Sequence, residues 1–386
     1  MKRIAVLTGG GHIGGYNAGL SGVWEKGEKL GWEIYGALDG WRGLARGEFV
    51  ELPGQEVADH AEKGGSILGS SRYKPELGEL TKTIAEHDID AVVAFGGDDT
   101  LSVLAELREE AGVPAVGWPK TMDNDLSGTY FTIGYPTAVG RSARAVRESA
   151  DMAYTHARVM ITTLFGRSTD WVATGAAAHG DADILIPGEK PTTVEEIYEK
   201  VKYVYKRNQE RYGKGFAVVV AAEGASIEGL SSHRRQSEEF DEFGHVKLSP
   251  HLLALSLSEA IQNHSKEDFG KPFGTAHQTM TYQLRNGPAN GLDRDIGYEA
   301  GRKCVGLLAD GAPGRMAAVR HEKEEGLTVD SVALSEAVEP RFVKGSGYVD
   351  YSEFRFTDSF LEYSRPFMGQ KQEKEINLLG RDEVVS

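Results

Sequence analysis

The stretch AVVAFGGDDTLSVLAELREEAG, residues 91–112, decides the fold class because it joins an apolar run to a helical segment through a glycine pair. The apolar start is typical of a strand buried in a parallel sheet, and the part after the glycines predicts a helix. Acidic residues are common at helix starts, where they complement the positive helix end. Two adjacent ones, Asp98 and Asp99, exceed what a cap needs, which indicates a metal site or a charge that excludes another anion.

The same order of short apolar run, glycine-containing turn and longer amphipathic segment recurs along the chain. The predicted strands are RIAVLT, WEIYGAL, AVVAF, AVGW, VMITTLF, ADILIP, GFAVVVAAEG, TMTYQL and MAAVRHEK. The predicted helices include residues 17–31, 77–87, 137–157, 193–213 and 293–311. This alternation predicts an α/β chain with two doubly wound, Rossmann-like domains, mostly parallel sheets and a cleft between the domains. The polar run 226–250 predicts an exposed insertion with a hairpin.

Length and composition restrict the classes of function. The chain has 386 residues, and a single core usually stops growing at roughly 250–300 residues, so two domains are expected. A formal net charge of −15 disfavours nucleic acid and anionic membranes as partners, but local Arg and Lys can still bind anionic small molecules. With Cys304 as the single cysteine, no internal disulfide is expected and the cytoplasm is the expected location. No signal peptide or membrane segment is expected, because no run approaches about 18 apolar residues.

The first glycine-rich loop, TGGGHIGGYN at residues 8–17, lies between a predicted strand and a predicted helix. Its glycines let backbone amides approach phosphate oxygens closely. Gly9, Gly11 and Gly14 match the dinucleotide fingerprint GxGxxG, and Asp39 ends the next strand, where that motif has its ribose-binding acid. In a chain with 48 glycines the match is weak, and a tight turn that binds phosphate explains the loop at least as well.

Ligands collect at the carboxyl ends of parallel strands, and the loop FGGDDTLS lies at such an end. Gly96 and Gly97 open a second phosphate-binding turn, and Asp98 is suited to a hard cation such as Mg²⁺. Asp99 would repel a phosphate placed against it.

The stretch PKTMDND, residues 119–125, follows the strand AVGW. Asp123 and Asp125 suit a general base beside a metal or an orienting acid, and Lys120 supplies a cation that neutralises a phosphate. An Asx-rich turn without chemistry explains the same residue types.

Cationic and polar residues stand at several further loop starts. They are Arg72, Arg158, Gly166, Arg167, Glu223, Tyr282 and Arg285. Arginine forks bind phosphates, and a glutamate accepts hydrogen bonds from sugar hydroxyls. Together these residues predict a phosphorylated substrate that carries hydroxyl groups.

With these motifs the chain resembles the phosphofructokinase A family from about residue 3 to residue 320. The matching pieces follow the family's order: LTGGGHIGGYNA, DGWRGL, GGSILGSSR, GGDD, PKTMDND, YFTIGYPTA, LFGR, VVAAEGA, and YQLR with the later DR. The combination of PKTMDND with GGDD is the specific part of this match. The resemblance implies a donor-binding domain at 1–137 plus about 288–340 and a sugar-phosphate-binding domain at 138–287. The tail 341–386 would pack back across both.

The resemblance implies phosphoryl transfer to the 1-hydroxyl of fructose 6-phosphate, giving fructose 1,6-bisphosphate. Asp123 would take the hydroxyl proton, with Thr121 and Asp125 shaping the site. Arg167 would stabilise the transferring phosphoryl group and Asp98 would hold Mg²⁺. The sugar phosphate would contact Asp125, Arg158, Gly166, Glu223, Tyr282 and Arg285, and the donor would contact Gly10, Gly11, Arg72, Gly97 and Thr100. Arg158 would reach in from a neighbouring subunit to bind the 6-phosphate, which implies a homodimer or homotetramer with shared active sites.

The resemblance also bears on the phosphoryl donor. ATP-using members have glycine at the position of Asp99 and typically at that of Lys120, whereas pyrophosphate-using members resemble this chain at both. Asp99 would repel an α-phosphate, and Lys120 would compensate the charge of the pyrophosphate leaving group. Inorganic pyrophosphate is therefore the expected donor, and the reaction is expected to be near-reversible. Trp41 stands where some ATP-using relatives place an aromatic residue against adenine, so an ATP-dependent kinase is the alternative.

The chain departs from the family pattern at a few positions. The most serious is Ala276, beside His277, where an arginine often precedes the YQLR segment by six residues. The others are His12, Gly14, Leu164, Phe165 and Asp170. Two other classes of protein are alternatives to the kinase. A non-catalytic sugar-phosphate sensor conflicts with intact Asp123 and Arg167, and an NAD-dependent dehydrogenase leaves PKTMDND unexplained.

Overall fold

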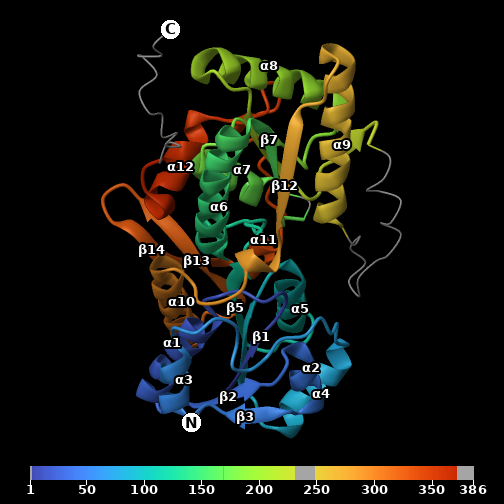
Figure 1. The fold of residues 1–386 in the computed structure, drawn as a ribbon. Coiled ribbons are helices and arrows are strands. Elements are labelled where there is room, and N and C mark those ends of the chain that lie inside the picture. Colours follow the sequence, from blue (N-terminus) through green and yellow to red (C-terminus); the bar gives the residue numbers. More distant parts are fainter. Residues whose placement is uncertain (1, 168, 231–247, 372–386) are drawn as a thin grey trace. The chain divides into compact units, whose positions relative to one another are not determined.

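The computed structural model describes residues 2–167, 169–230 and 248–371 (Figure 1). Most of the predicted insertion at 226–250 lies outside these residues, as does the end of the predicted tail. The described chain divides into a first unit, residues 2–138 and 282–342, and a second unit, residues 139–230, 248–281 and 343–371. Both units are α/β and are built on mostly parallel sheets, which confirms the predicted fold class.

The first unit contains an eight-stranded sheet with the order β14-β13-β5-β4-β1-β2-β3, in which β6 also pairs with β5. Its strands are β1 (Arg3–Thr8), β2 (Glu33–Ala37), β3 (Phe49–Glu51), β4 (Ala91–Gly96), β5 (Ala115–Thr121), β6 (Ile133–Gly134), β13 (Arg315–Glu322) and β14 (Gly326–Ala333). Only the edge strands β3 and β14 pair antiparallel with their neighbours. The central strands β1 and β4 are wholly or almost wholly buried, as expected for a parallel sheet covered on both faces.

The helices of the first unit follow the strands in βα order. They are α1 (Tyr16–Lys29), α2 (Trp41–Arg46), α3 (Gly54–His60), α4 (Leu77–Glu86), α5 (Asp98–Glu109), α10 (Gly291–Ala309) and α11 (Leu334–Ala337), with the short 3-10 helix η1 (Tyr282–Leu284). Helices α1 and α10 lie in close contact because each has a glycine at the crossing. A Cβ on Gly22 would lie 2.1 Å from the Tyr298 carbonyl oxygen, and one on Gly301 would lie 2.1 Å from that of Gly19.

The second unit has a parallel sheet of four strands in the order β12-β7-β10-β8. These strands are β7 (Arg158–Leu164), β8 (Ile184–Ile186), β10 (Ala217–Ala222) and β12 (Gly274–Met280). Two small pairs accompany them: β9 (Thr192–Thr193) with β11 (Ile227–Glu228), and β15 (Val349–Asp350) with β16 (Arg355–Phe356). The helices are α6 (Tyr135–His156), which begins in the first unit, α7 (Trp171–Gly180), α8 (Val194–Tyr212), α9 (Pro250–Phe269) and α12 (Asp358–Met368).

Alternation along the strands of the second unit separates its helices into two layers (Figure 1). Val159 and Ile161 of β7 and Val219 of β10 share one core with α8 and α9. The alternate residues face the opposite side, where α7 contacts β8 and β10. Every residue of α7 is buried, so this helix shows no polar stripe in the sequence.

The strand predicted at TMTYQL, residues 279–284, exists, but its predicted bounds are wrong. The strand β12 ends at Met280, and Tyr282–Leu284 form η1 instead. As an edge strand, β12 is only partly buried, so its residues, GTAHQTM, lack the apolar signal of a central strand. Among the described helices, none combines the length and the apolar composition needed to cross a membrane.

Candidate functional site

The first glycine-rich loop leaves the end of β1 and is held by hydrogen bonds that its glycines make possible. Tyr16, the first residue of α1, donates its hydroxyl to the Gly9 carbonyl at 2.6 Å, and Ser70 donates to the Gly10 carbonyl at 2.7 Å. Gly10 has a φ of 78°, a conformation that side-chain-bearing residues rarely adopt. A Cβ on Gly11 would lie 2.2 Å from Arg285 Nη1, so a side chain at this position would displace the Arg285 guanidinium.

Lys120, near the end of β5, reaches into this loop. Its side chain is 3% exposed, its Nζ donates to the Gly11 carbonyl at 3.0 Å, and the same Nζ lies 4.9 Å from the centre of the Tyr16 ring. Burial, together with the positive charge of Arg285, lowers the pKa of Lys120 to about 7. The carboxylates of Asp98, Asp123 and Asp125 oppose this shift. An anion bound against Lys120 would raise its pKa again. Phosphate binding would therefore favour the protonated, charged form of Lys120.

The stretch after β5 forms a tight turn around Asp123, which is 6% exposed. Thr121 Oγ1 accepts a hydrogen bond from the Asp123 N–H at 3.1 Å and donates to Asp123 Oδ2 at 3.3 Å. Asn124 has a φ of 54°, and its side chain accepts from the Thr132 N–H at 2.9 Å. Arg285 Nη2 lies 3.9 Å from Asp123 Oδ2. The turn is therefore Asx-rich, as one interpretation of the sequence predicted, and it also presents a buried carboxylate between a hydroxyl and a guanidinium.

Asp98 and Asp99 are the first two residues of α5, after the N-cap Gly97. Gly97 has no side chain with which to cap the helix, and the negative charges of both acids complement the helix end. Asp98 is exposed, whereas Asp99 is half-buried. Thr100, which is 3% exposed, packs against the glycines of both loops: a Cβ on Gly9 or on Gly96 would lie 2.4 Å or less from its side chain.

The structure thus brings together, within the first unit, Gly10, Gly11, Thr100, Lys120, Thr121, Asp123 and Arg285. Asp125 follows on the same turn, where its carbonyl accepts from the Arg341 N–H at 2.7 Å. Arg72 is exposed and lies two residues after Ser70, which bonds to Gly10. Tyr282 opens η1 and is 64% exposed.

In the second unit, three of the predicted residues meet at the carboxyl ends of β7 and β10. The Glu223 carboxylate accepts from the Gly166 N–H at 3.1 Å and from the Arg167 N–H at 2.7 Å. Glu223 is 7% exposed, and Arg167 has a φ of 50°, a strained conformation for a residue with a side chain. Glu223 is therefore occupied in holding the loop, a role that the sequence did not indicate.

Arg158 lies at the other end of β7, seven residues before Phe165 begins this loop. At about 3.3 Å per residue β7 separates the Arg158 and Leu164 backbones by roughly 20 Å, so Arg158 and the loop at Gly166 do not share a site within one chain. Arg158 instead lines a hollow of about 470 Å³ that opens between β12 and α9. Its other lining residues include Ser258, Gln262, Ala276 and His277.

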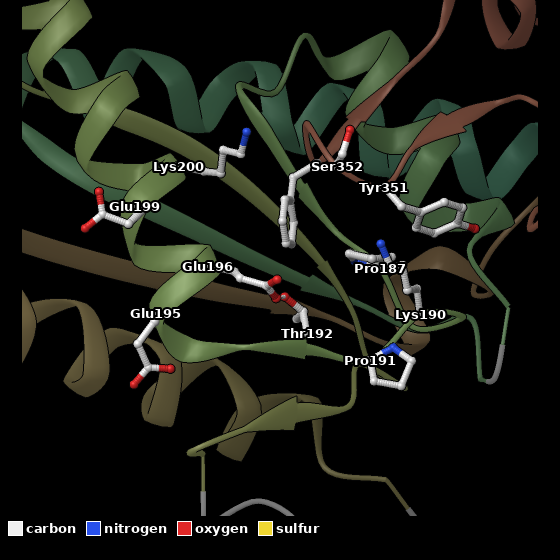
Figure 2. Close-up of a pocket in the computed structure, with 11 residues that line it drawn as sticks. Pro187, Lys190, Pro191, Thr192, Glu195, Glu196, Glu199, Lys200, Tyr351 and Ser352 are labelled. Atoms are coloured by element: carbon white, nitrogen blue, oxygen red, sulfur yellow. Dashed lines mark hydrogen bonds between the residues drawn. The ribbon is translucent and has the colours of Figure 1, made fainter.

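A further hollow of about 480 Å³ lies beside the start of α8 (Figure 2). Pro187, Pro191, Tyr351 and Phe354 give it an apolar wall. Glu196 bonds to Thr192 at 2.8 Å at its edge, as part of the capping box of α8. No predicted site residue lines this hollow.

Sequence reasoning missed several residues that support the site. Tyr16 lies under Lys120, and Met122 Sδ accepts from Arg285 Nε at 3.3 Å. Asp293, fully buried, accepts from the Gly134 and Thr137 N–H groups at 2.8 Å each. These residues are far apart in sequence from their partners, and only Asp293 had a signal, as the aspartate of the DR pair.

The donor set for a metal is small. Among the described residues no group of three or more His, Cys, Asp or Glu side chains is placed to hold a metal ion. Mg²⁺ is usually bound by one or two carboxylates and by substrate phosphates, and it keeps several waters. The exposed carboxylate of Asp98 at the start of α5 fits that kind of binding.

Comparisons with known proteins agree with this geometry. The phosphofructokinase family model matches residues 3–308. The pyrophosphate–fructose 6-phosphate 1-phosphotransferase of Amycolatopsis methanolica is 36% identical over 341 residues, which covers 87% of this chain and 94% of the relative. The enzyme of the same name from Dictyoglomus thermophilum is 34% identical, and the match covers 82% of this chain and 89% of that relative. An ATP-dependent 6-phosphofructokinase 3 of Streptomyces coelicolor is 33% identical, covering 87% and 95%.

Two solved structures of pyrophosphate-dependent phosphofructokinases share the fold. The one from Nitrosospira multiformis has a TM-score of 0.80 at 20% identity, covering 96% of this chain and 93% of its own. The one from Marinobacter aquaeolei has a TM-score of 0.78 at 20% identity, covering 98% and 94%. The family match over residues 3–308, with relatives more than 30% identical over most of the chain, means that this chain belongs to the phosphofructokinase family.

Proposed function

We propose that this phosphofructokinase transfers a phosphoryl group from inorganic pyrophosphate to the 1-hydroxyl of fructose 6-phosphate. The products are fructose 1,6-bisphosphate and inorganic phosphate, and the reaction runs in both directions. The observation that carries the proposal is the buried Lys120 ammonium, which lies against the first glycine-rich loop and donates to Gly11. It puts a positive charge where the leaving phosphate would develop negative charge.

The donor loops belong to the first unit. Gly10, Gly11, Gly97 and Thr100 form a compact phosphate-binding surface, with Arg72 exposed near it. Asp99 at the start of α5 disfavours a third phosphate, because a carboxylate there repels another anion. Trp41, the residue that would stack on adenine, is only 4% exposed and packs in the core of the first unit. A buried Trp41 favours pyrophosphate over ATP.

Asp123 is the general base. Its carboxylate is buried, hydrogen-bonded to Thr121 and 3.9 Å from Arg285 Nη2. In this role Asp123 accepts the proton from the sugar 1-hydroxyl as the oxygen attacks phosphorus. Arg285 and the exposed Tyr282, with Asp125, hold the sugar phosphate. Asp98 holds Mg²⁺, which neutralises phosphate charge when it is bound.

Three residues of the second unit, Gly166, Arg167 and Glu223, are assigned to the sugar phosphate. Glu223 fixes the Gly166 and Arg167 amides, so Arg167 is presented from a rigid loop. Arg167 stabilises the charge of the transferring phosphoryl group, the usual use of an arginine in phosphoryl transfer. Because Arg158 lies at the opposite end of β7, it serves the active site of a neighbouring subunit, where it binds the 6-phosphate. The enzyme is thus a homodimer or homotetramer, and we place it in cytoplasmic glycolysis and gluconeogenesis.

Product identification tests this function. Purified protein with Mg²⁺, fructose 6-phosphate and pyrophosphate is expected to give fructose 1,6-bisphosphate and phosphate in phosphorus NMR. Fructose 1,6-bisphosphate with phosphate is expected to give the reverse reaction. Asp123→Asn serves as the matched control, because it keeps the shape of the turn and removes the base. Formation of the bisphosphate from ATP but not from pyrophosphate would contradict the proposal.

A further inference from the structure

Asp170 and Glu189 exchange hydrogen bonds between the loop that carries Arg167 and the loop that follows β8. The Asp170 carboxylate accepts from the Gly188 N–H at 2.5 Å and from the Glu189 N–H at 3.3 Å. In return, Glu189 Oε1 accepts from the Asp170 N–H at 2.8 Å. Each carboxylate therefore accepts hydrogen bonds from backbone N–H groups of the other loop, a reciprocal exchange like that of a capping box at a helix start.

A third segment of the second unit joins this exchange. The Tyr351 hydroxyl donates to Asp170 Oδ2 at 3.2 Å, while its ring lies on the wall of the hollow beside Pro187 and Lys190 (Figure 2). The Val343 N–H donates to Glu189 Oε1 at 2.9 Å, and the Lys344 N–H donates to Glu189 Oε2. The two carboxylates thus join three segments of the second unit through hydrogen bonds. We call Asp170, Glu189 and Tyr351 together the carboxylate clamp.

Aspartate is common at helix starts, but Asp170 does not cap the helix that follows it. It is the N-cap of α7 by position, but its side chain makes no bond to that helix and is fully buried. Burial, with a smaller effect from the charge of Glu189, raises the pKa of Asp170 to about 6, although the bonds from Gly188, Glu189 and Tyr351 oppose this shift. Burying a carboxylate without hydrogen-bond partners costs free energy of folding. The bonds by which Asp170 joins the loops offset that cost and account for its presence here.

The clamp lies next to the strained part of the Arg167 loop. Gly166 and Arg167 are anchored by Glu223, Phe165 donates its N–H to the Met280 carbonyl at 3.1 Å, and Asp170 closes the loop on its other side. A left-handed conformation at a residue such as Arg167 costs about 1–2 kcal/mol and persists where the surroundings fix it. Carboxylates on both sides of Arg167 therefore determine the backbone from which its guanidinium projects.

We propose that Asp170 and Glu189 are positioning residues for phosphoryl transfer, because they fix the loop that presents Arg167. The inference rests on the proposed function only in naming the reaction that Arg167 serves. A small displacement of a group that stabilises a transition state lowers the rate more than it lowers ground-state binding. The clamp therefore acts on kcat through Arg167, without touching the substrates.

The kinetic test compares Asp170→Asn with Asp183→Asn. In the first variant the new amide N–H₂ faces a backbone N–H, so one clamp bond is lost. Asp183 is a matched control: a buried carboxylate of the same unit that accepts from the Val218 N–H at 2.9 Å, away from the loop. Asp170→Asn is expected to lower kcat by about 10- to 100-fold while KM for fructose 6-phosphate changes by less than about threefold. Asp183→Asn is expected to leave kcat within about twofold.

A double-mutant cycle separates positioning from general destabilisation. If Asp170 acts through Arg167, Asp170→Asn has no further effect on kcat in an Arg167→Ala background. An equal loss in both backgrounds, or unchanged kcat in a folded Asp170→Asn, overturns the proposal. Should Asp170→Asn fail to fold, Tyr351→Phe removes one clamp bond more mildly and is expected to lower kcat by about threefold.

Hydrogen exchange tests the clamp without the reaction. The amides of Gly166, Arg167 and Thr169 are expected to exchange about tenfold faster in Asp170→Asn than in the wild type or in Asp183→Asn. Unchanged exchange at these amides overturns the inference whatever the enzyme's substrates are. A wild type that shows no transfer from pyrophosphate, with exchange that still responds to Asp170→Asn, refutes the proposed function and leaves the clamp standing.

Discussion

Lys120 Nζ lies 4.9 Å from the centre of the Tyr16 ring, and the Tyr16 hydroxyl donates to the glycine-rich loop to which Lys120 also donates. The ammonium is therefore held between an aromatic face and the Gly11 carbonyl, in a site that is 3% exposed. A cation over an aromatic face gains electrostatic attraction, most of all where water is excluded. This arrangement fixes the position of the Lys120 amine at the donor loop before any substrate binds.

The donor preference is expected to depend on Asp99 and Lys120 together. The double substitution Asp99→Gly with Lys120→Gly removes the charge that repels a longer donor and the charge that favours a short one. The ratio of kcat/KM for pyrophosphate to kcat/KM for ATP is expected to fall by about 100-fold, which corresponds to about 2.7 kcal/mol. Steady-state kinetics with each donor measure it. A conserved ratio would show that these residues do not select the donor.

Donor binding is expected to weaken as pH rises through about 7. The pKa of Lys120 in the free enzyme is about 7, mainly because of burial, so the charged form is present below that pH and lost above it. Above the pKa, kcat/KM for pyrophosphate is expected to fall by up to about tenfold per pH unit. Lys120→Gln, measured from pH 6 to pH 9 beside the wild type, corrects for the titration of pyrophosphate itself. Parallel profiles for the two proteins would contradict this role of Lys120.

Asp123→Asn is expected to abolish most of the catalysis with little effect on substrate binding. Loss of a general base typically lowers the rate by about 10²- to 10⁴-fold. Because the amide keeps the contact with Thr121, KM for fructose 6-phosphate is expected to stay within about threefold. Thr121→Ser, which retains the hydroxyl, is the control. A decrease in kcat smaller than tenfold would exclude Asp123 as the base.

Mixed oligomers test whether Arg158 acts across subunits. Arg158→Ala and Asp123→Asn are each expected to be inactive alone. After the two proteins are unfolded and refolded together, hybrid dimers are expected to contain one complete active site, so about a quarter of the wild-type activity returns. Refolding each variant separately before mixing is the control. Failure of the hybrids to regain activity, with hybrid formation verified by mass spectrometry, would place Arg158 in its own subunit's site.

The hollow beside Arg158 offers a gain-of-function test. Ala276 lines it with Arg158 and His277, at the position where the sequence resemblance leads us to expect an arginine. Ala276→Arg adds a second guanidinium, and KM for fructose 6-phosphate is expected to fall by about 5- to 10-fold, as for one more charge-assisted phosphate contact. Ala276→Lys, which adds charge without the fork, is expected to give a smaller effect. An unchanged or higher KM in Ala276→Arg would mean that the 6-phosphate does not bind here.

Local sequence patterns predict the buried strands and the loops that directly follow them. The strands β1, β4, β5, β7 and β10 are continuous apolar runs, and the glycine and aspartate motifs follow them directly. Edge strand β12 and buried helix α7 lack such patterns, because the first is half-exposed and the second has no polar face. Contacts between distant segments leave no local signal. Lys120 over Tyr16 and Asp170 with Glu189 are of this kind.

The most direct test of the central claim is the donor specificity of the wild-type enzyme. Initial rates with fructose 6-phosphate and Mg²⁺ are measured with pyrophosphate and ATP offered separately, the ATP being freed of contaminating pyrophosphate by a pyrophosphatase that is removed before the assay. We predict that kcat/KM for pyrophosphate exceeds that for ATP by at least about 100-fold, as the charges of Asp99 and Lys120 require. An equal or greater kcat/KM with ATP would contradict the account.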